Sequence, residues 1–188
     1  MVNQPNNILH ASVAENAVVD GSLSPPEALQ KAVAFLNSIG LTTKFIQLKK
    51  ECFLPGLSIE DGEILIDVEA ILYPGDLLHE AGHLAVMPAA ERATANAEAI
   101  ALRPHREAEE MMAICWSYAA CLHLGLPTSF VFHEEGYKGG GNYIAENFDK
   151  KNYFGLPMLQ WAGMAYDEQR ATENGSAAYP AMINWLRD

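Results

Sequence analysis

The sequence predicts an α+β fold in which a small mixed or antiparallel sheet packs on two long helices. Two short apolar runs on either side of a turn dipeptide, within residues 57–66, form the pattern of a β-hairpin. Two longer apolar segments, residues 77–87 and 111–122, have the length of buried helices and are too short to span a bilayer. The 188 residues can bury a substantial core. We therefore expect a single domain over 1–188, with residues 1–22 as an irregular N-terminal extension.

The charge of the chain argues against a nucleic-acid partner. Twelve basic and 24 acidic residues give a formal net charge of −12, which would repel a phosphate backbone. The N-terminus has no basic region followed by an apolar run, so we expect neither a secretory signal nor a membrane partner. The odd count of 3 cysteines, without C-x-x-C spacing, predicts free thiols in a reducing compartment. We expect a cytoplasmic protein, whose oligomeric state the sequence leaves open.

The first element is a helix that begins near Pro25. Ser24 and Glu27 have the spacing of a capping box, with proline at the first helical positions between them. Gly40 is a typical C-terminal stop. The apolar residues between these signals recur at helical spacing and define one buried face, namely Leu29, Val33, Leu36 and Ile39.

Short strands follow this helix. Residues 45–48 and 52–54 are apolar runs of strand length. The predicted hairpin joins residues 57–59 to residues 64–66 through Asp61-Gly62, with one further residue completing the connection. Whether the second hairpin strand is an edge strand, able to pair with an extended peptide, is not fixed by its sequence.

The helix at residues 77–87 carries the most informative pattern in the chain, His79-Glu80-Ala81-Gly82-His83. Positions four apart lie on one helical face, so both imidazoles can reach a single metal ion. Glu80 lies about 100° around the helix, beside the ion, where a carboxylate can act as a general base. Gly82 costs about 1 kcal/mol relative to alanine inside a helix, which suggests that another backbone or a ligand passes close to it. The competing interpretation is a core helix with two surface histidines.

These residues resemble the active-site helix of the zincin metallopeptidases, over about residues 76–88. Val86 and Ala89 stand where the metzincin branch requires a glycine and a third histidine, which leaves the gluzincin branch. In that branch the third ligand is a glutamate on a helix further along the chain. We expect Glu110 to be this third ligand, because it opens the apolar run 111–122. Its separation from the second histidine also resembles that in compact soluble H-E-x-G-H peptidases. Glu109 and Glu107 are the reserves, and the other two candidates are Glu91 and Glu98.

The resemblance implies zinc held by His79, His83 and Glu110, with Glu80 as the base and a peptide or protein as substrate. Two alternatives keep the metal. The same centre could hydrolyse a non-peptide amide or ester, or a fourth ligand such as His105 or His133 could close the site into a non-catalytic binding or regulatory module. A third alternative is a plain interaction domain without metal.

A second group of candidates follows the predicted helix 111–122, which Gly125 and Pro127 end. Peptide hydrolysis passes through an oxyanion that a nearby side chain can stabilise by donating a hydrogen bond. We select His133 and Tyr143 for this role and keep Tyr137 beside them. The competing interpretation is that each of the three is structural.

The remaining segments are expected to complete the domain. The triple glycine at 139–141 lacks a phosphate-binding pattern and forms either an ordinary loop or a mobile loop over a cleft. Residues 153–164 are dense in large apolar side chains and form core or a cleft wall. Residues 179–186 are predicted to form a closing helix, with proline at its start, that packs on the domain.

Overall fold

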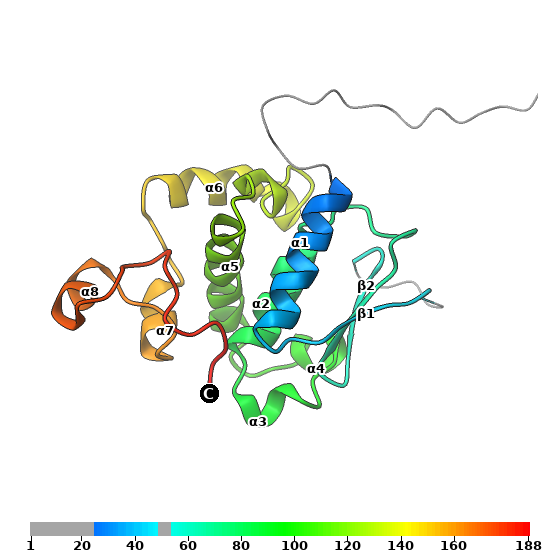
Figure 1. The fold of residues 1–188 in the computed structure, drawn as a ribbon, viewed down its shortest axis with the longest axis horizontal. Coiled ribbons are helices and arrows are strands. Elements are labelled where there is room, and N and C mark those ends of the chain that lie inside the picture. The colour runs from blue at the N-terminus through cyan, green and yellow to red at the C-terminus, as the bar shows by residue number, and fades with distance from the viewer. Residues whose placement is uncertain (1–24, 49–53) are drawn as a thin grey trace, which may run out of the picture.

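The fold was described from a computed structural model that covers residues 25–48 and 54–188. Its architecture is α+β, as the sequence predicts, with one small sheet and mostly helices (Figure 1). The predicted extension 1–22, the capping residue Ser24 and residues 52–53 of a predicted strand lie outside the described residues. The α-helices and strands are α1 (Pro25–Ser38), β1 (Thr43–Phe45), β2 (Leu57–Glu60), β3 (Glu63–Ile66), α2 (Asp76–Val86), α3 (Ala89–Arg92), α4 (Ala97–Ala101), α5 (Arg106–His123), α6 (Gly141–Asp149), α7 (Leu156–Trp161) and α8 (Glu168–Asn174).

The sheet is mixed, in the order β1-β3-β2, with β1 parallel and β2 antiparallel to β3. The hairpin between β2 and β3 is confirmed, with Glu60 paired to Glu63 across a two-residue turn. Asp61 and Gly62 have φ angles of 48° and 72°, the left-handed conformation that this kind of tight hairpin turn requires. Because β3 is paired on both sides, the strand that precedes α2 is the central strand of this sheet and not an edge.

The strand predicted at residues 45–48 is wrong beyond Phe45, where β1 ends. The main chain turns toward the side chain of Asp67, whose Oδ2 accepts a hydrogen bond from the Leu48 N–H at 2.9 Å. This hydrogen bond takes the place of the next main-chain bond between β1 and β3. Leu54, from the other predicted strand, forms only an isolated bridge with Leu57.

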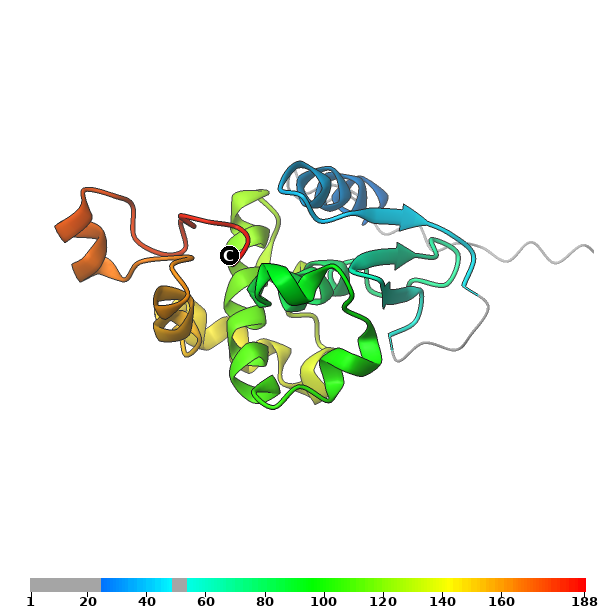
Figure 2. The same ribbon diagram turned by 90° about the horizontal axis from the view of Figure 1, so that it is seen from below.

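Helices α2 and α5 pack against each other in the core, as expected for the two apolar segments. In Figure 1, α1 and α2 lie between the sheet and α5, and both ribbon views place α8 at the end of the molecule opposite the sheet (Figures 1 and 2). A Cβ atom on Gly82 would lie only 2.9 Å from the main-chain oxygen of Ala113 in α5. The close backbone approach predicted at Gly82 is therefore confirmed.

Helix α5 begins earlier than the sequence suggests. It starts at Arg106 rather than near residue 111, so Glu110 lies inside the helix instead of opening it. The apolar run marks the point at which α5 enters the core, since its buried residues begin at Met112, while Arg106 and Glu107 at its start are exposed.

After α5 the chain forms a short 3-10 helix, Thr128–Phe130. One further prediction about local structure is wrong. The segment 179–186 is not a helix, because its main chain bonds to other parts of the molecule. The Ile183 N–H donates to the Met164 oxygen, and the Trp185 oxygen accepts from the Trp116 indole N–H at 2.8 Å. The segment still packs on the domain, as predicted.

None of the described helices combines the length and the apolar character needed to cross a membrane.

Candidate metal centre

Helix α2 presents His79 and His83 on one face, one turn apart. Their Nε2 atoms lie 3.1 Å from each other, and the two rings meet edge to face at an angle of 80°. Each side chain is 14% exposed. Both histidines therefore direct a ring nitrogen to the same partly shielded point, as the four-residue spacing predicts.

Helix α5 brings Glu110 to this point. Its Oε1 atom lies 3.5 Å from the Nε2 atom of His79, and its Oε2 atom lies 3.4 Å from the Nε2 atom of His83. One ligand atom from each of the three side chains lies within 4.8 Å of the other two, which no other group of three metal-ligating side chains achieves in the described part of the chain. The packing of α2 on α5 thus creates the cluster.

The other candidate glutamates are engaged elsewhere or face solvent. Glu109 receives two hydrogen bonds from the Arg103 guanidinium, at 2.6 and 2.8 Å, and Arg103 also pairs with Glu91. Glu98 and Glu107 are exposed. Of the five glutamates that the sequence offers, the structure brings Glu110 to the histidines.

The electrostatics of the cluster suit a cation. Burial, followed by the neighbouring charge of His83, lowers the pKa of His79 well below its usual value, and burial lowers the pKa of His83 to about 4. Both imidazoles are therefore neutral near pH 7 and keep a lone pair for a metal. Burial raises the pKa of Glu110, a cost that a bound cation would offset. Two imidazole nitrogens and a carboxylate form a donor set that fits zinc.

Glu80 lies next to the ligands on α2. Burial is the main cause that raises the pKa of its carboxyl to about 7, and the carboxylates of Asp76 and Glu110 add to this effect. No hydrogen bond or ion pair occupies its carboxyl in the parts of the chain that the structure describes. A carboxyl with this pKa can both accept and release a proton near neutral pH.

The three candidate hydrogen-bond donors occupy different positions. The Nε2 atom of His133 lies 2.9 Å from Oδ1 of Asp76, at the start of α2, and its ring stacks on Tyr73 with centroids 4.0 Å apart. The hydroxyl of Tyr137 lies 3.1 Å from Nδ1 of His79. Tyr143, in α6, is 70% exposed, and its main-chain oxygen accepts a hydrogen bond from the Asn147 side chain. The structure thus brings Tyr137 to a candidate ligand and leaves Tyr143 outside the cluster.

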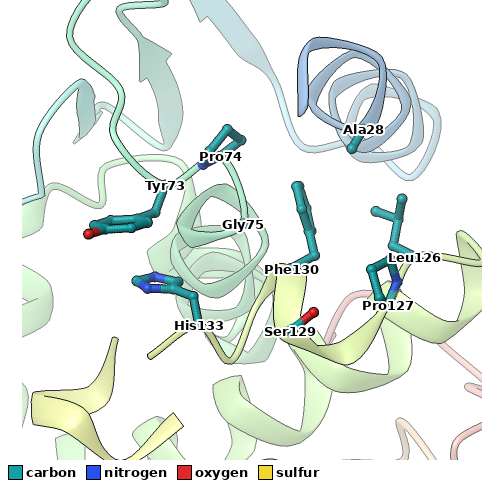
Figure 3. Close-up of a pocket in the computed structure, with 9 residues that line it drawn as sticks. All are labelled: Ala28, Tyr73, Pro74, Gly75, Leu126, Pro127, Ser129, Phe130 and His133. Atoms are coloured by element: carbon teal, nitrogen blue, oxygen red, sulfur yellow. The ribbon is translucent and has the colours of Figure 1, made fainter. Parts of the chain in front are cut away.

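A pocket of about 210 Å³ lies at the N-terminal end of α2. Figure 3 shows Tyr73 and His133 on one side of it and Leu126 and Pro127 on the other. The wall is mainly apolar and includes Ala28 of α1. Because His133 also bonds to Asp76, three residues before His79, the pocket lies about one helical turn from the first candidate ligand.

Comparison of the chain with protein-family models, with curated proteins and with solved structures finds no match. The likeness to zincins therefore depends on the residues around the metal-site helix alone.

Proposed function

We propose that this protein is a zinc-dependent hydrolase of the zincin type that cleaves peptide bonds. The observation that carries the proposal is the meeting of Glu110 with both histidines, since two oxygens of one carboxylate face two imidazole nitrogens from another helix. His79, His83 and Glu110 would hold the ion. Zinc, when bound, would act as a Lewis acid that polarises a substrate carbonyl and makes water more acidic.

The role of Glu80 follows from its own surroundings. Its carboxyl is partly buried beside the candidate ligands, and this burial raises its pKa to about 7. A base with this pKa takes a proton from water at neutral pH and can return it to the leaving amine. In this proposal Glu80 moves the proton, while the three ligands hold the metal.

The number of candidate ligands supports a catalytic centre over a closed structural one. Structural zinc sites are usually closed by four protein ligands, whereas catalytic sites leave one position open. The two histidines that could supply a fourth ligand are elsewhere: His133 bonds to Asp76, and His105 is exposed at the start of α5. A non-peptide amide or ester would meet the same residues, so the substrate class is decided by screening.

The cellular setting is part of the same proposal. The described cysteines, Cys115 and Cys121, are buried free thiols, in keeping with a reducing compartment such as the cytoplasm. The net charge of −12 favours a peptide or protein substrate over nucleic acid.

Metal content is the first test. Elemental analysis of the purified protein is expected to find about one zinc per chain. His79→Ala and Glu110→Ala should each lose most of it, whereas Glu107→Ala, which alters an exposed glutamate on the same helix, should keep it. A zinc-loaded wild type and a zinc-loaded Glu110→Ala protein would together exclude Glu110 as a ligand.

The hydrolytic mechanism is tested separately with Glu80→Gln. This variant should keep its zinc and lose at least about 10²-fold in rate, because the amide cannot accept the proton. Rates are measured on a peptide library by mass spectrometry, with a matched set of non-peptide amides and esters. Wild-type rates in Glu80→Gln would contradict the mechanism, and cleavage confined to the non-peptide set would change the substrate class.

A further inference from the structure

Two consecutive glutamates of α5 lie where either could serve as the third metal ligand. Ala113 of α5 is the residue that an added Cβ on Gly82 would meet, and Gly82 directly precedes His83. Glu109 and Glu110 are four and three residues before Ala113, so they lie about 40° and 60° from it around the helix, on either side. Helical geometry therefore places both carboxylates at the contact of α2 with α5, close to the histidines.

The side chains of these two glutamates point in different directions. Glu110 directs its oxygens to His79 and His83, at 3.5 and 3.4 Å. Glu109 is the more buried of the two, with 13% of its side chain exposed against 43% for Glu110, but its oxygens point elsewhere. Burial lowers the pKa of His83 to about 4, and the charge of Glu109 opposes this lowering, so Glu109 lies within electrostatic range of the site. Direction, rather than position on α5, distinguishes the two glutamates.

Arg103, which lies between α4 and α5, accounts for the direction of Glu109. Its Nε atom donates to Oε2 of Glu109 at 2.6 Å and its Nη2 atom donates to Oε1 at 2.8 Å, so the guanidinium binds both carboxylate oxygens. Such two-pronged pairs are among the strongest and most directional hydrogen bonds in proteins. Arg103 is 18% exposed, so the pair is partly shielded from water. The remaining nitrogen, Nη1, bonds to Glu91 of α3 and anchors the guanidinium from a second side.

We propose that Arg103 is a positioning residue that selects the third metal ligand. By holding both oxygens of Glu109, it keeps this carboxylate from the histidines and leaves Glu110 as their acidic partner. The consequence is that Glu109, once released from Arg103, can replace a missing Glu110. The identity of the metal as zinc rests on the proposed function.

The test is the zinc affinity of full-length variants, measured by competition with a chromogenic chelator. Glu110→Ala alone should bind zinc weakly, because its remaining carboxylate neighbour is held by Arg103. Adding Arg103→Gln to Glu110→Ala releases Glu109 and should raise the affinity by about 10-fold, a coupling of the size found within one network of charged side chains. An arginine with a merely structural role would do the opposite, since its loss would weaken zinc binding further.

Two controls separate the release of Glu109 from a general effect of charge. Adding Glu109→Gln to the double variant removes the substitute carboxylate, and the gain in affinity should disappear, whereas a gain due only to the lost charge of Arg103 would remain. Combining Glu91→Gln with Glu110→Ala alters the other partner of Arg103, leaves Glu109 held, and should give no gain.

Thermal unfolding of the metal-free proteins checks that each variant is folded. Arg103→Lys is the second variant at this position, because lysine keeps the charge but lacks the planar fork that binds both oxygens of Glu109. In the Glu110→Ala protein it should give a smaller gain in zinc affinity than Arg103→Gln.

Either of two results would overturn the inference. One is a folded Arg103→Gln, Glu110→Ala protein that binds zinc no better than Glu110→Ala, and the other is a gain that persists after Glu109→Gln. With either result, a wild type that binds zinc leaves the proposed function standing. A wild type that binds no zinc would overturn the proposed function, and this inference with it.

Discussion

Glu80 connects the acidity of the site with the stability of the metal-free protein. Its pKa is raised from 4.5 to about 7, mainly by burial and then by the charges of Asp76 and Glu110. The folded chain therefore binds the proton more tightly than the unfolded chain. The resulting stabilisation is complete below pH 4.5 and is lost as the pH rises through about 7. His83 acts in the opposite direction, because its pKa is lowered from 6.5 to about 4 and its contribution is lost as the pH falls.

Glu80→Gln separates these two effects. In metal-free protein, the free energy of unfolding of the wild type minus that of the variant should fall by about 1–3 kcal/mol between pH 4.5 and pH 7. The His83 contribution is present in both proteins and cancels. The measurement is urea unfolding at several pH values, with Glu107→Gln as an exposed control whose difference stays nearly constant. A constant difference for Glu80→Gln would show that the carboxyl titrates normally.

At the scale of single residues, the sequence predicts those contacts that local helical geometry creates. His79 and His83 are four residues apart, so helical geometry alone places them together. Glu110 could be chosen only from five glutamates, because its position depends on how two helices pack. The contact of Tyr137 with His79 spans 58 positions of sequence and has no spacing signal. His133 is a candidate because of its residue type alone, and its bond to Asp76 depends on the fold.

At the scale of elements, the contact of α2 with α5 sets the geometry of the cluster. Gly82 lies at a close approach of the two backbones, where an added Cβ would meet the oxygen, Cα and Cβ atoms of Ala113 at 2.9, 3.1 and 3.2 Å. Two of these three atoms belong to the backbone, so neither helix can yield by turning a side chain. The distance between the histidines and Glu110 therefore depends on a residue that carries no ligand.

Gly82→Ala tests this dependence. Alanine favours an isolated helix by up to about 1 kcal/mol over glycine, whereas overpacking in a core costs about 1–3 kcal/mol. We expect the second effect to prevail, with a net loss of stability in urea unfolding and weaker zinc binding in a chelator competition. Increased stability with unchanged zinc affinity would mean that α2 and α5 can move apart to accommodate the added methyl group without loss of stability.

The elements that the sequence predicts best are those defined by local signals. Asp61-Gly62 predicts the hairpin because this dipeptide readily adopts the left-handed conformation that a tight hairpin turn requires. The proline and apolar residues of the segment 179–186 predict a helix, which the segment does not form. Its main chain instead bonds to Met164, and its Trp185 oxygen to the Trp116 indole, contacts that only tertiary structure creates.

For the molecule as a whole, the C-terminal segment ties α1, α2 and α5 together. Trp185 meets the edges of Phe35 and Trp116, with ring centroids 4.9 and 5.6 Å apart. The Arg187 N–H donates to the oxygen of Ala85 in α2 at 2.9 Å. The last residues of the described chain thus contact three helices, of which α2 and α5 carry the candidate ligands.

Trp185→Ala should therefore destabilise the protein by about 2–4 kcal/mol, through lost burial and aromatic contacts. Trp161→Ala is the matched control, since Trp161 is 78% exposed and mainly meets the Arg187 guanidinium 5.2 Å above its ring. Its loss should cost no more than about 1 kcal/mol. Urea unfolding followed by circular dichroism compares the two, and equal losses would contradict a bracing role for Trp185.

The central position of β3 limits how a substrate could be recognised. Both neighbours already use the main-chain groups of this strand, so the strand that leads into the metal-site helix has no open edge for an incoming chain. Main-chain pairing at that strand is closed to a peptide. Selection among peptides would then depend more on side chains and loops around the site, where single substitutions can alter preference while the sheet stays intact.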